Sequence, residues 1–185
     1  MTGRVALLTT NLAAGGAETQ VAQLAVGLRR HGWDVSVISL LQPTAFEKEL
    51  ADAGVPVFSL KMTPGIGNPL GYIRLIAVLR SLRPEILHGH MFHGNLMARL
   101  ARLVSPIPAV ISTLHSAAES GRDSAGVRLR DRLYRTTDRL SDVTVAVSRA
   151  VADRHVSARA VSPARLHIIS NGVDTGRFRP DESRR

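Results

Sequence analysis

The stretch RVALLTTNLAAGGAETQVAQLAVGLRRHGWDVSVISL, residues 4–40, decides the fold class. It opens with a short apolar run, RVALLTT (4–10), whose length and flanking loop residues predict a buried strand. An amphipathic segment with helical spacing of its apolar side chains begins at Ala17, and basic residues precede Gly32, which is a common C-terminal signal of helices. A second apolar run, DVSVISL (34–40), completes a strand–helix–strand unit.

The same alternation of strands and helices continues along the chain. Because strands separated by helices need crossover connections, the sequence predicts a Rossmann-like α/β domain. Such a domain has a parallel sheet, here of about seven strands, with helices on both faces. Further strands are expected at 55–60, 85–90, 109–115, 142–148 and 166–171, and further helices at 44–53, 72–83, 94–104, 124–140 and up to about 155.

Composition limits the class of protein. The chain has 185 residues, of which 44% are apolar and 21% charged, as in an ordinary globular domain. It contains no cysteine, which excludes disulfides and thiolate metal sites and favours a reducing compartment. No apolar run reaches the length of a signal peptide core or a membrane span, so a cytoplasmic protein is expected.

The net charge of +9 comes almost entirely from arginine, since Lys48 and Lys61 are the only lysines. This balance favours anionic partners such as phosphorylated metabolites or an anionic membrane surface. A GC-rich genome would produce the same excess of arginine, so composition alone names no ligand. Nucleic acid is not expected as a partner, because aromatic residues are only 4% of the chain and do not alternate with basic ones.

Ligands of such sheets bind outside the carboxyl ends of the strands. This rule selects four loops with polar or glycine content, at 11–16, 88–93, from His115 onward and at 171–174. The loops follow the first, fourth, fifth and last predicted strands, so they should meet at one edge of the sheet.

The adjacent glycines Gly15 and Gly16 precede the first helix. Backbone N–H groups at a helix start form an anion site, and glycine lets a phosphate or sugar approach closely. The alternative is a sharp turn that needs positive φ angles. Glu18, in the first helical turn, either complements the helix dipole or accepts hydrogen bonds from sugar hydroxyls.

The segment HGHMFHGN (88–95) places His88, His90 and His93 close together. Metal binding is an alternative, but no carboxylate or thiolate lies within the cluster to complete a coordination shell. Contact with a ligand is favoured for His90 and His93, and a packing role for His88. His115 ends the fifth predicted strand, where it can hydrogen-bond a substrate or polarise a reacting group.

Four arginines follow helical spacing in RLRDRLYRTTDRL (128–140), with Leu129, Leu133 and Leu140 on another face. A solvated face with Asp131 and Asp138 as ion-pair partners is one interpretation. Contact with anionic lipid is the other. The four arginines of this face are Arg128, Arg132, Arg135 and Arg139.

Five segments together resemble the N-terminal domain of glycosyltransferase family 4 (GT4), retaining enzymes of the GT-B fold. These are GGAE after the first strand, ILHGH, STLHS, VTVAVSRAVAD (143–153) and IISNGVDTGRFRP (168–180), and they occur in the family's order along nearly the whole chain. The resemblance implies a metal-independent transferase without a cofactor, which moves a sugar from a nucleotide-diphosphate sugar to an acceptor. It also implies attachment to the inner face of the membrane through basic helices.

The resemblance assigns roles to the candidate residues. Gly15, Gly16 and Glu18 would border the donor's phosphates and sugar, and His115 would be the active-site histidine. The acceptor side of the cleft would be lined by His90, together with His93 and Asn11. Asn171 and Gly172, in the SNGVD motif, would lead into the interdomain linker.

The sequence departs from the family at its C-terminal end. The family's second Rossmann domain carries paired glutamates in an E-x7-E motif, whereas Glu182 is the only glutamate after Glu119. Residues 1–174 are therefore expected to form the acceptor-binding domain and 175–185 the start of a linker or tail. The second domain would come from the same gene or from a separate chain. Two alternatives remain open, a non-catalytic anion-binding, sugar-binding or scaffold module and a metal-dependent hydrolase using His88, His90 and His93.

Overall fold

A seven-stranded parallel sheet organises the chain in the computed structural model, which describes residues 3–63, 69–117, 124–173 and 175. The strands lie side by side in the order β3-β2-β1-β4-β5-β6-β7, and every neighbouring pair is parallel. The predicted Rossmann-like α/β fold is therefore confirmed. The strands are β1 (Arg4–Thr9), β2 (Asp34–Ser39), β3 (Val57–Ser59), β4 (Ile86–His90), β5 (Ala109–Leu114), β6 (Val143–Ala146) and β7 (Leu166–Ile168).

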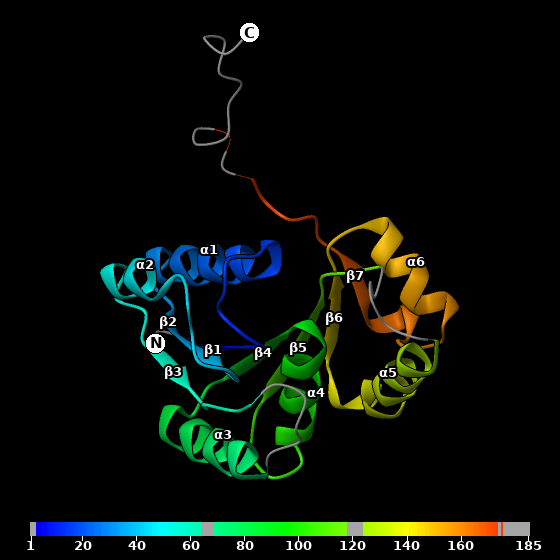
Figure 1. Ribbon diagram of the computed structural model, residues 1–185, viewed down its shortest axis with the longest axis horizontal. Helices are drawn as coiled ribbons and strands as arrows, with labels where there is room; N and C mark the ends of the chain where they lie inside the picture. Colours follow the sequence, from blue (N-terminus) through cyan, green and yellow to red (C-terminus); the bar gives the residue numbers. More distant parts are fainter. Residues whose placement is uncertain (1–2, 64–68, 118–123, 174, 176–185) are drawn as a thin grey trace, which may run out of the picture.

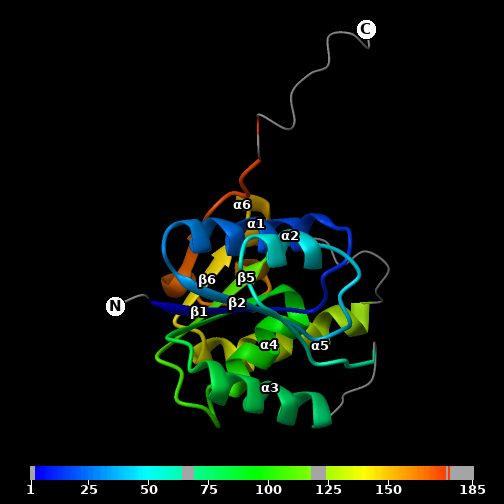
Figure 2. The same cartoon turned by 90° about the vertical axis from the view of Figure 1, so that its left-hand side faces the viewer.

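Helices cover both faces of the sheet. Figure 2 shows α1 and α2 above the sheet and α3, α4 and α5 below it, while Figure 1 shows α6 next to β7 at the far end. The helices are α1 (Gly16–Arg30), α2 (Glu47–Asp52), α3 (Pro69–Leu82), α4 (Met91–Ala101), α5 (Ser124–Thr137) and α6 (Arg149–Ser157), with 3-10 turns η1 (Asp138–Leu140) and η2 (Pro163–Arg165). Among the described residues, no helix has the length and apolarity needed to span a bilayer.

The alternation of side chains along β1 explains why the core has two layers. Leu7 packs with α1 residues on one face of the sheet, whereas Leu8 packs with α3 and α4 residues on the other. Both leucines are fully buried. A strand buried on both faces has a continuous apolar sequence, as β1 does.

The end of α1 confirms the sequence signal at Gly32. This glycine has a φ of 84°, and its N–H donates to the carbonyl of Arg29. The N–H of Trp33 donates to the carbonyl of Leu28. The two bonds form a Schellman motif, which satisfies carbonyls that the helix leaves free and turns the chain into β2.

Several predicted boundaries were too generous. The helix expected at 44–53 is limited to Glu47–Asp52, because Phe46 before it has a left-handed φ of 64°. The strand expected at 55–60 forms pairs only over Val57–Ser59. The linker or tail expected at 175–185 lies outside the described residues except for Thr175.

Candidate functional site

The strand order reverses between β1 and β4. From β1 the chain proceeds to β2 and β3 on one side, and from β4 it proceeds to β5, β6 and β7 on the other. The connections leaving β1 and β4 therefore diverge at the carboxyl ends of these strands, which is the position where ligands of open α/β sheets bind. The predicted loops at 11–16 and near His90 flank this point.

The junction between β4 and α4 is tighter than the sequence predicted. A loop was expected at 88–93, but β4 ends at His90 and α4 begins at Met91. Met91 makes the turn alone, with a left-handed φ of 60° that is unfavourable for a residue other than glycine. The strained turn leaves His90 at the edge of the sheet and directs α4 beneath it.

Two glycines let α4 pack directly against the sheet. A Cβ on Gly94 would lie 2.7 Å from the backbone oxygen of Leu8, and one on Gly89 would lie 2.8 Å from the Cα of Asn95. Neither contact can be relieved by moving a side chain, so these positions require glycine. The close approach fixes the start of α4 against the ends of β1 and β4.

Three histidines meet at this edge. His90 Nδ1 lies 3.2 Å from His115 Nε2, within hydrogen-bond distance. The ring of His88 stacks on His90 with 4.1 Å between centroids, and its Nε2 lies 2.7 Å from Thr113 Oγ1. The adjacent pairing of β4 and β5 brings together side chains 25 residues apart in sequence.

These histidines are held neutral. Burial lowers the pKa of His88 and of His115 to about 4, and for His88 the nearby His115 adds to the effect. Burial and the neighbouring imidazoles also lower the pKa of His90 well below its ordinary value. Neutral imidazoles can both donate and accept hydrogen bonds, which suits contact with hydroxyls or phosphate oxygens.

Among the described residues, seven buried side-chain polar atoms have no hydrogen-bond partner, and four of them belong to residues at or next to this edge, the other three being Ser105 Oγ, Asp138 Oδ1 and Arg165 Nε. Such atoms cost about 1–3 kcal/mol each unless a ligand or water satisfies them. The four at this edge come from the end of β1, from β4 and the following helix, and from the residue after β5. These four atoms are Thr10 Oγ1, His90 Nε2, Asn95 Oδ1 and His115 Nδ1.

Gly15 and Gly16 do not form the sharp turn with positive φ angles that was the alternative interpretation of this pair. Gly15 has an extended φ of −166°, and only Gly32 and Gly54 among the described glycines have positive φ angles. A Cβ on Gly16 would meet nothing within 4 Å, whereas one on Gly15 would meet the flexible carboxylate of Glu18 at 2.4 Å. The space above Gly16 is therefore open, at the N-terminus of a 15-residue helix.

The remaining predicted site residues are distributed around this edge. Asn11 is half-buried just beyond β1, and its carbonyl accepts a hydrogen bond from Thr9 Oγ1. Asn171 and Gly172 are exposed, and the carbonyl of Gly172 accepts a hydrogen bond from Gln20 of α1. This contact brings the segment after β7 alongside the first helix.

His93 lies apart from the histidine cluster. Because α4 begins at Met91, His93 occupies its first turn, is exposed and contacts the edge of the Phe92 ring. Across the residues that the structure describes, no group of three or more histidine, aspartate or glutamate side chains is arranged to hold a metal ion. The alternative of a hydrolase with a metal on His88, His90 and His93 therefore has no support in the geometry.

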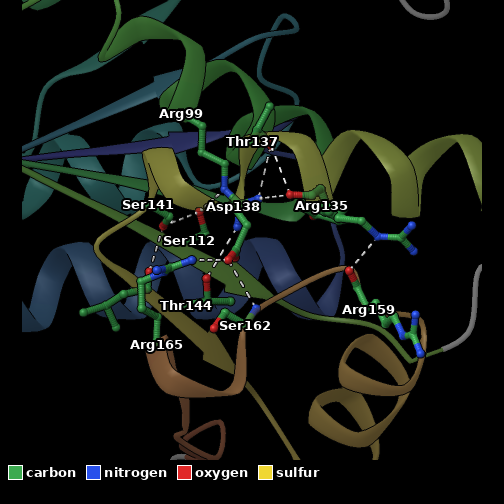
Figure 3. A network of polar contacts seen from close by, with 12 residues as sticks. Arg99, Ser112, Arg135, Thr137, Asp138, Ser141, Thr144, Arg159, Ser162 and Arg165 are labelled. Atoms are coloured by element: carbon green, nitrogen blue, oxygen red, sulfur yellow. Dashed lines mark hydrogen bonds and ion pairs between the residues drawn. The ribbon is translucent and has the colours of Figure 1, made fainter.

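A buried polar network that was not expected from the sequence supports the site from below. Arg99 of α4 is fully buried and donates to Ser112 of β5, to the Tyr134 carbonyl, to Thr137 and to Thr144 of β6 (Figure 3). Burial lowers the pKa of Arg99. The same helix carries Asn95, whose amide donates to the Thr113 carbonyl and to the Tyr134 hydroxyl. Polar residues four positions apart on the apolar face of the predicted helix were the available signal.

The arginine-rich helix differs from its predicted pattern. Leu129 is 59% exposed, and the buried position is Tyr134. The predicted partner Asp131 pairs with Arg154 of α6, and Asp138 pairs with Arg165, so neither aspartate binds an arginine of its own helix face.

The Arg135 side chain also forms hydrogen bonds within the protein. It donates to the carbonyls of Ala158 and Arg159 at the end of α6. Figure 3 shows its contact with Arg159. Arg128, Arg132 and Arg139 are exposed.

The comparison with known families decides the assignment. The family model described as Glycosyltransferase Family 4 matches residues 14–177. This range contains every helix and strand of the structure except β1. The chain belongs to glycosyltransferase family 4. The resemblance of the five sequence segments to this family is therefore confirmed.

Several solved structures share the fold of the family 4 chain. HepE of Anabaena, solved with UDP and with UDP-glucose, superposes with TM-scores of 0.77 and 0.75 at 17% identity, covering 98% and 97% of this chain and 47% of HepE. A glycosyltransferase of Rickettsia africae has a TM-score of 0.72 at 14% identity, over 95% of this chain and 44% of its own. At these identities the likeness concerns the fold alone.

A curated relative is similar over a shorter stretch. Alpha-maltose-1-phosphate synthase of Mycolicibacterium smegmatis is 28% identical over 103 residues, which is 52% of this chain and 26% of that protein. The chain thus spans about a quarter of this relative and about half of the solved structures it matches.

Proposed function

We propose that this family 4 chain is the acceptor-side half of a retaining glycosyltransferase that uses a nucleotide-diphosphate sugar. The observation that carries the proposal is the group of unpartnered buried polar atoms at the carboxyl ends of β1, β4 and β5. These atoms lie where ligands of doubly wound sheets bind, beside the open helix N-terminus at Gly16. HepE, a fold relative, binds UDP-glucose, which supports a nucleotide sugar as donor.

The site residues take complementary roles in this proposal. Gly15 and Gly16 lie against the donor's phosphates and sugar, and Glu18 accepts hydrogen bonds from sugar hydroxyls. His115 contacts the transferred sugar near the reacting carbon. His90, His93 and Asn11 face the acceptor, and no metal or other cofactor takes part. Neutralisation of the leaving diphosphate then depends on helix N-termini and cationic side chains.

Residues 1–174 form the acceptor-binding domain in this proposal, and the SNGVD segment with Asn171 and Gly172 leads into a linker. A second Rossmann domain grips the nucleotide, from the same gene or from a separate chain. The hydrogen bond from Gln20 to Gly172 supports this path, because it holds the departing segment beside α1 and the candidate site.

The proposal is tested with a pair of matched glycine variants. Gly16→Ala and Gly27→Ala both place a Cβ where nothing lies within 4 Å, and both sites are in α1. The chain is combined with the second domain of a family 4 enzyme, and sugar transfer from UDP-glucose is measured. Gly16→Ala should lower transfer at least tenfold, and Gly27→Ala should leave it unchanged.

His115→Ala provides the second arm of this test, with an expected loss of about 100-fold in transfer. Equal activity of the two glycine variants, together with full activity of His115→Ala, would contradict the proposed site. Binding of UDP-glucose without transfer by any combination would instead favour a non-catalytic sugar-binding module.

Attachment to an anionic membrane surface, on its cytoplasmic side, is part of the proposal. The attachment is supported by three exposed arginines and the exposed Leu129. The arginines are Arg128 and Arg132 of α5 and Arg139 of the 3-10 turn after it. Arg128→Gln with Arg132→Gln should weaken sedimentation with anionic liposomes at low salt. Arg30→Gln, an exposed arginine of α1 on the other face of the sheet, is the control. Equal sedimentation of all variants would refute the attachment through α5.

A further inference from the structure

The contact between His90 and His115 constrains both imidazoles at once. His90 Nδ1 and His115 Nε2 are 3.2 Å apart, so one nitrogen carries the proton and the other offers its lone pair. The opposite nitrogens, His90 Nε2 and His115 Nδ1, are buried without a hydrogen-bond partner. The pair therefore has one internal bond and two free ends.

Counting protons shows that the two free ends always differ in character. A neutral imidazole carries a single N–H. If His90 donates from Nδ1, its Nε2 is a bare acceptor and His115 carries its proton on Nδ1. If His115 donates from Nε2, its Nδ1 is the bare acceptor and His90 carries its proton on Nε2. Either way, one free nitrogen is a donor and the other an acceptor.

We propose that His90 is a positioning residue that couples its own tautomer to that of His115, so that both rings carry their proton on the same type of nitrogen. His115 Nδ1 then offers a donor to a phosphate or carbonyl oxygen, or an acceptor to a sugar hydroxyl. His90 Nε2 offers the complement. The assignment of His115 to the donor sugar rests on the proposed function, whereas the coupling itself rests on the contact alone.

The surroundings hold His90 in this role. Its side chain is 2% exposed, and its ring stacks at 4.1 Å on His88, which in turn contacts Thr113 Oγ1. The left-handed Met91 follows directly and fixes the backbone at the end of the strand. His90 therefore has little room to turn away from His115 when a ligand arrives.

Neutrality of the pair supports the coupling. Burial lowers the pKa of both imidazoles, that of His115 to about 4. At neutral pH neither ring carries a second proton, so the one-proton count applies to both.

The coupling is tested by long-range ¹H–¹⁵N NMR of the ¹⁵N-labelled chain, which distinguishes Nδ1–H from Nε2–H in each ring. The chain has seven histidines, and single variants assign their signals. We expect His90 and His115 to show the same tautomer in the free protein, and to change together if UDP-glucose changes either. One ring with Nδ1–H and the other with Nε2–H would overturn the proposal.

Three variants separate positioning from packing. His90→Phe keeps an aromatic ring against His88 and should alter the ¹⁵N shifts of His115. His90→Asn places an amide near the position of Nδ1 and should restore a single tautomer of His115. His155→Phe removes another buried histidine, which bonds to Val151 of its own helix, and should leave the pair unchanged.

The outcomes for the coupling and for the proposed function are distinct. Unchanged His115 signals in His90→Phe would overturn the coupling, whatever the chain binds. Matched tautomers that do not respond to UDP-glucose when the second domain of a family 4 enzyme is added would support the coupling and count against His115 as a donor-sugar contact.

Discussion

Two buried polar regions of this chain, both built on α4 and its flanking strands, are satisfied to different degrees. Arg99, in the helix interior, is fully buried and each of its three guanidinium nitrogens has an acceptor within the protein. His90, at the helix start, is 2% exposed, and it and His115 each keep one buried nitrogen without a partner. The Arg99 side chain is fully bonded within the protein, although Asp138 Oδ1 and Arg165 Nε nearby lack a partner, whereas the His90–His115 pair keeps two free ends.

This contrast separates structural from ligand-binding polar groups within a single chain. Burial alone does not distinguish Arg99 from His90, and neither does the direction of their pKa shifts, since burial lowers both. The hydrogen bonding of the two side chains does, because every guanidinium nitrogen of Arg99 has an acceptor and His90 Nε2 has no partner, and a folded chain rarely leaves buried donors and acceptors unpaired.

The largest expected effect is on stability, at Arg99. Arg99→Ala removes the bonds that join α4 to β5, α5 and β6 and leaves a cavity under the sheet. We expect the free energy of unfolding to fall by about 3–5 kcal/mol, measured by urea denaturation. His90→Phe, which replaces a partly unsatisfied polar ring with an apolar one, should change it by less than about 1.5 kcal/mol. Equal losses in the two variants would break the comparison.

A smaller effect on stability is expected at the glycines of the candidate site. Gly94→Ala forces a Cβ against the backbone of Leu8 and should cost about 1–3 kcal/mol in the free energy of unfolding. Gly16→Ala meets nothing within 4 Å and should be neutral in the same urea titration. A destabilised Gly16→Ala would mean that this glycine serves the fold rather than a ligand.

A separate effect, with pH rather than with sequence, is expected from the histidine cluster. The pKa values of His88 and His115 are about 4 in the folded chain and near 6.5 when unfolded, so the unfolded state binds more protons between these values. The free energy of unfolding therefore has its highest value above about pH 6.5 and decreases as the pH drops toward 4. We expect the apparent Tm to drop by roughly 5 °C or more from pH 7 to pH 5.

His115→Phe should reduce this drop, and His155→Phe is the matched control from the α5–α6 interface. A wild-type Tm that is constant between pH 7 and pH 5 would show that the histidines are not held neutral by the fold.

Most of the fold could be predicted from the sequence, because its signals are local. The apolar run of β1, the helical spacing of α1 and the stop at Gly32 each depend on neighbouring residues only, and the alternation of such units implies a parallel sheet. The rule that ligands bind at the carboxyl ends of strands then placed His90 and His115 at one edge.

The parts of the site that the sequence did not predict depend on contacts between distant residues. The 3.2 Å contact of His90 with His115 requires the pairing of β4 with β5, and the strained turn at Met91 has no local signal. The partners of Asp131 and Asp138 come from α6 and η2 rather than from their own helix, because tertiary packing decides which arginine is within reach.

The central claim is that the edge formed by β1, β4 and β5 binds the donor sugar. The decisive measurement is a titration with UDP-glucose of the ¹⁵N-labelled chain combined with the second domain of a family 4 enzyme, followed through backbone amide shifts. We predict the largest shifts at Gly15, Gly16 and His115, and small ones around Arg99 and along α3. Shifts confined to the α5–α6 surface, or none at millimolar UDP-glucose, would contradict it.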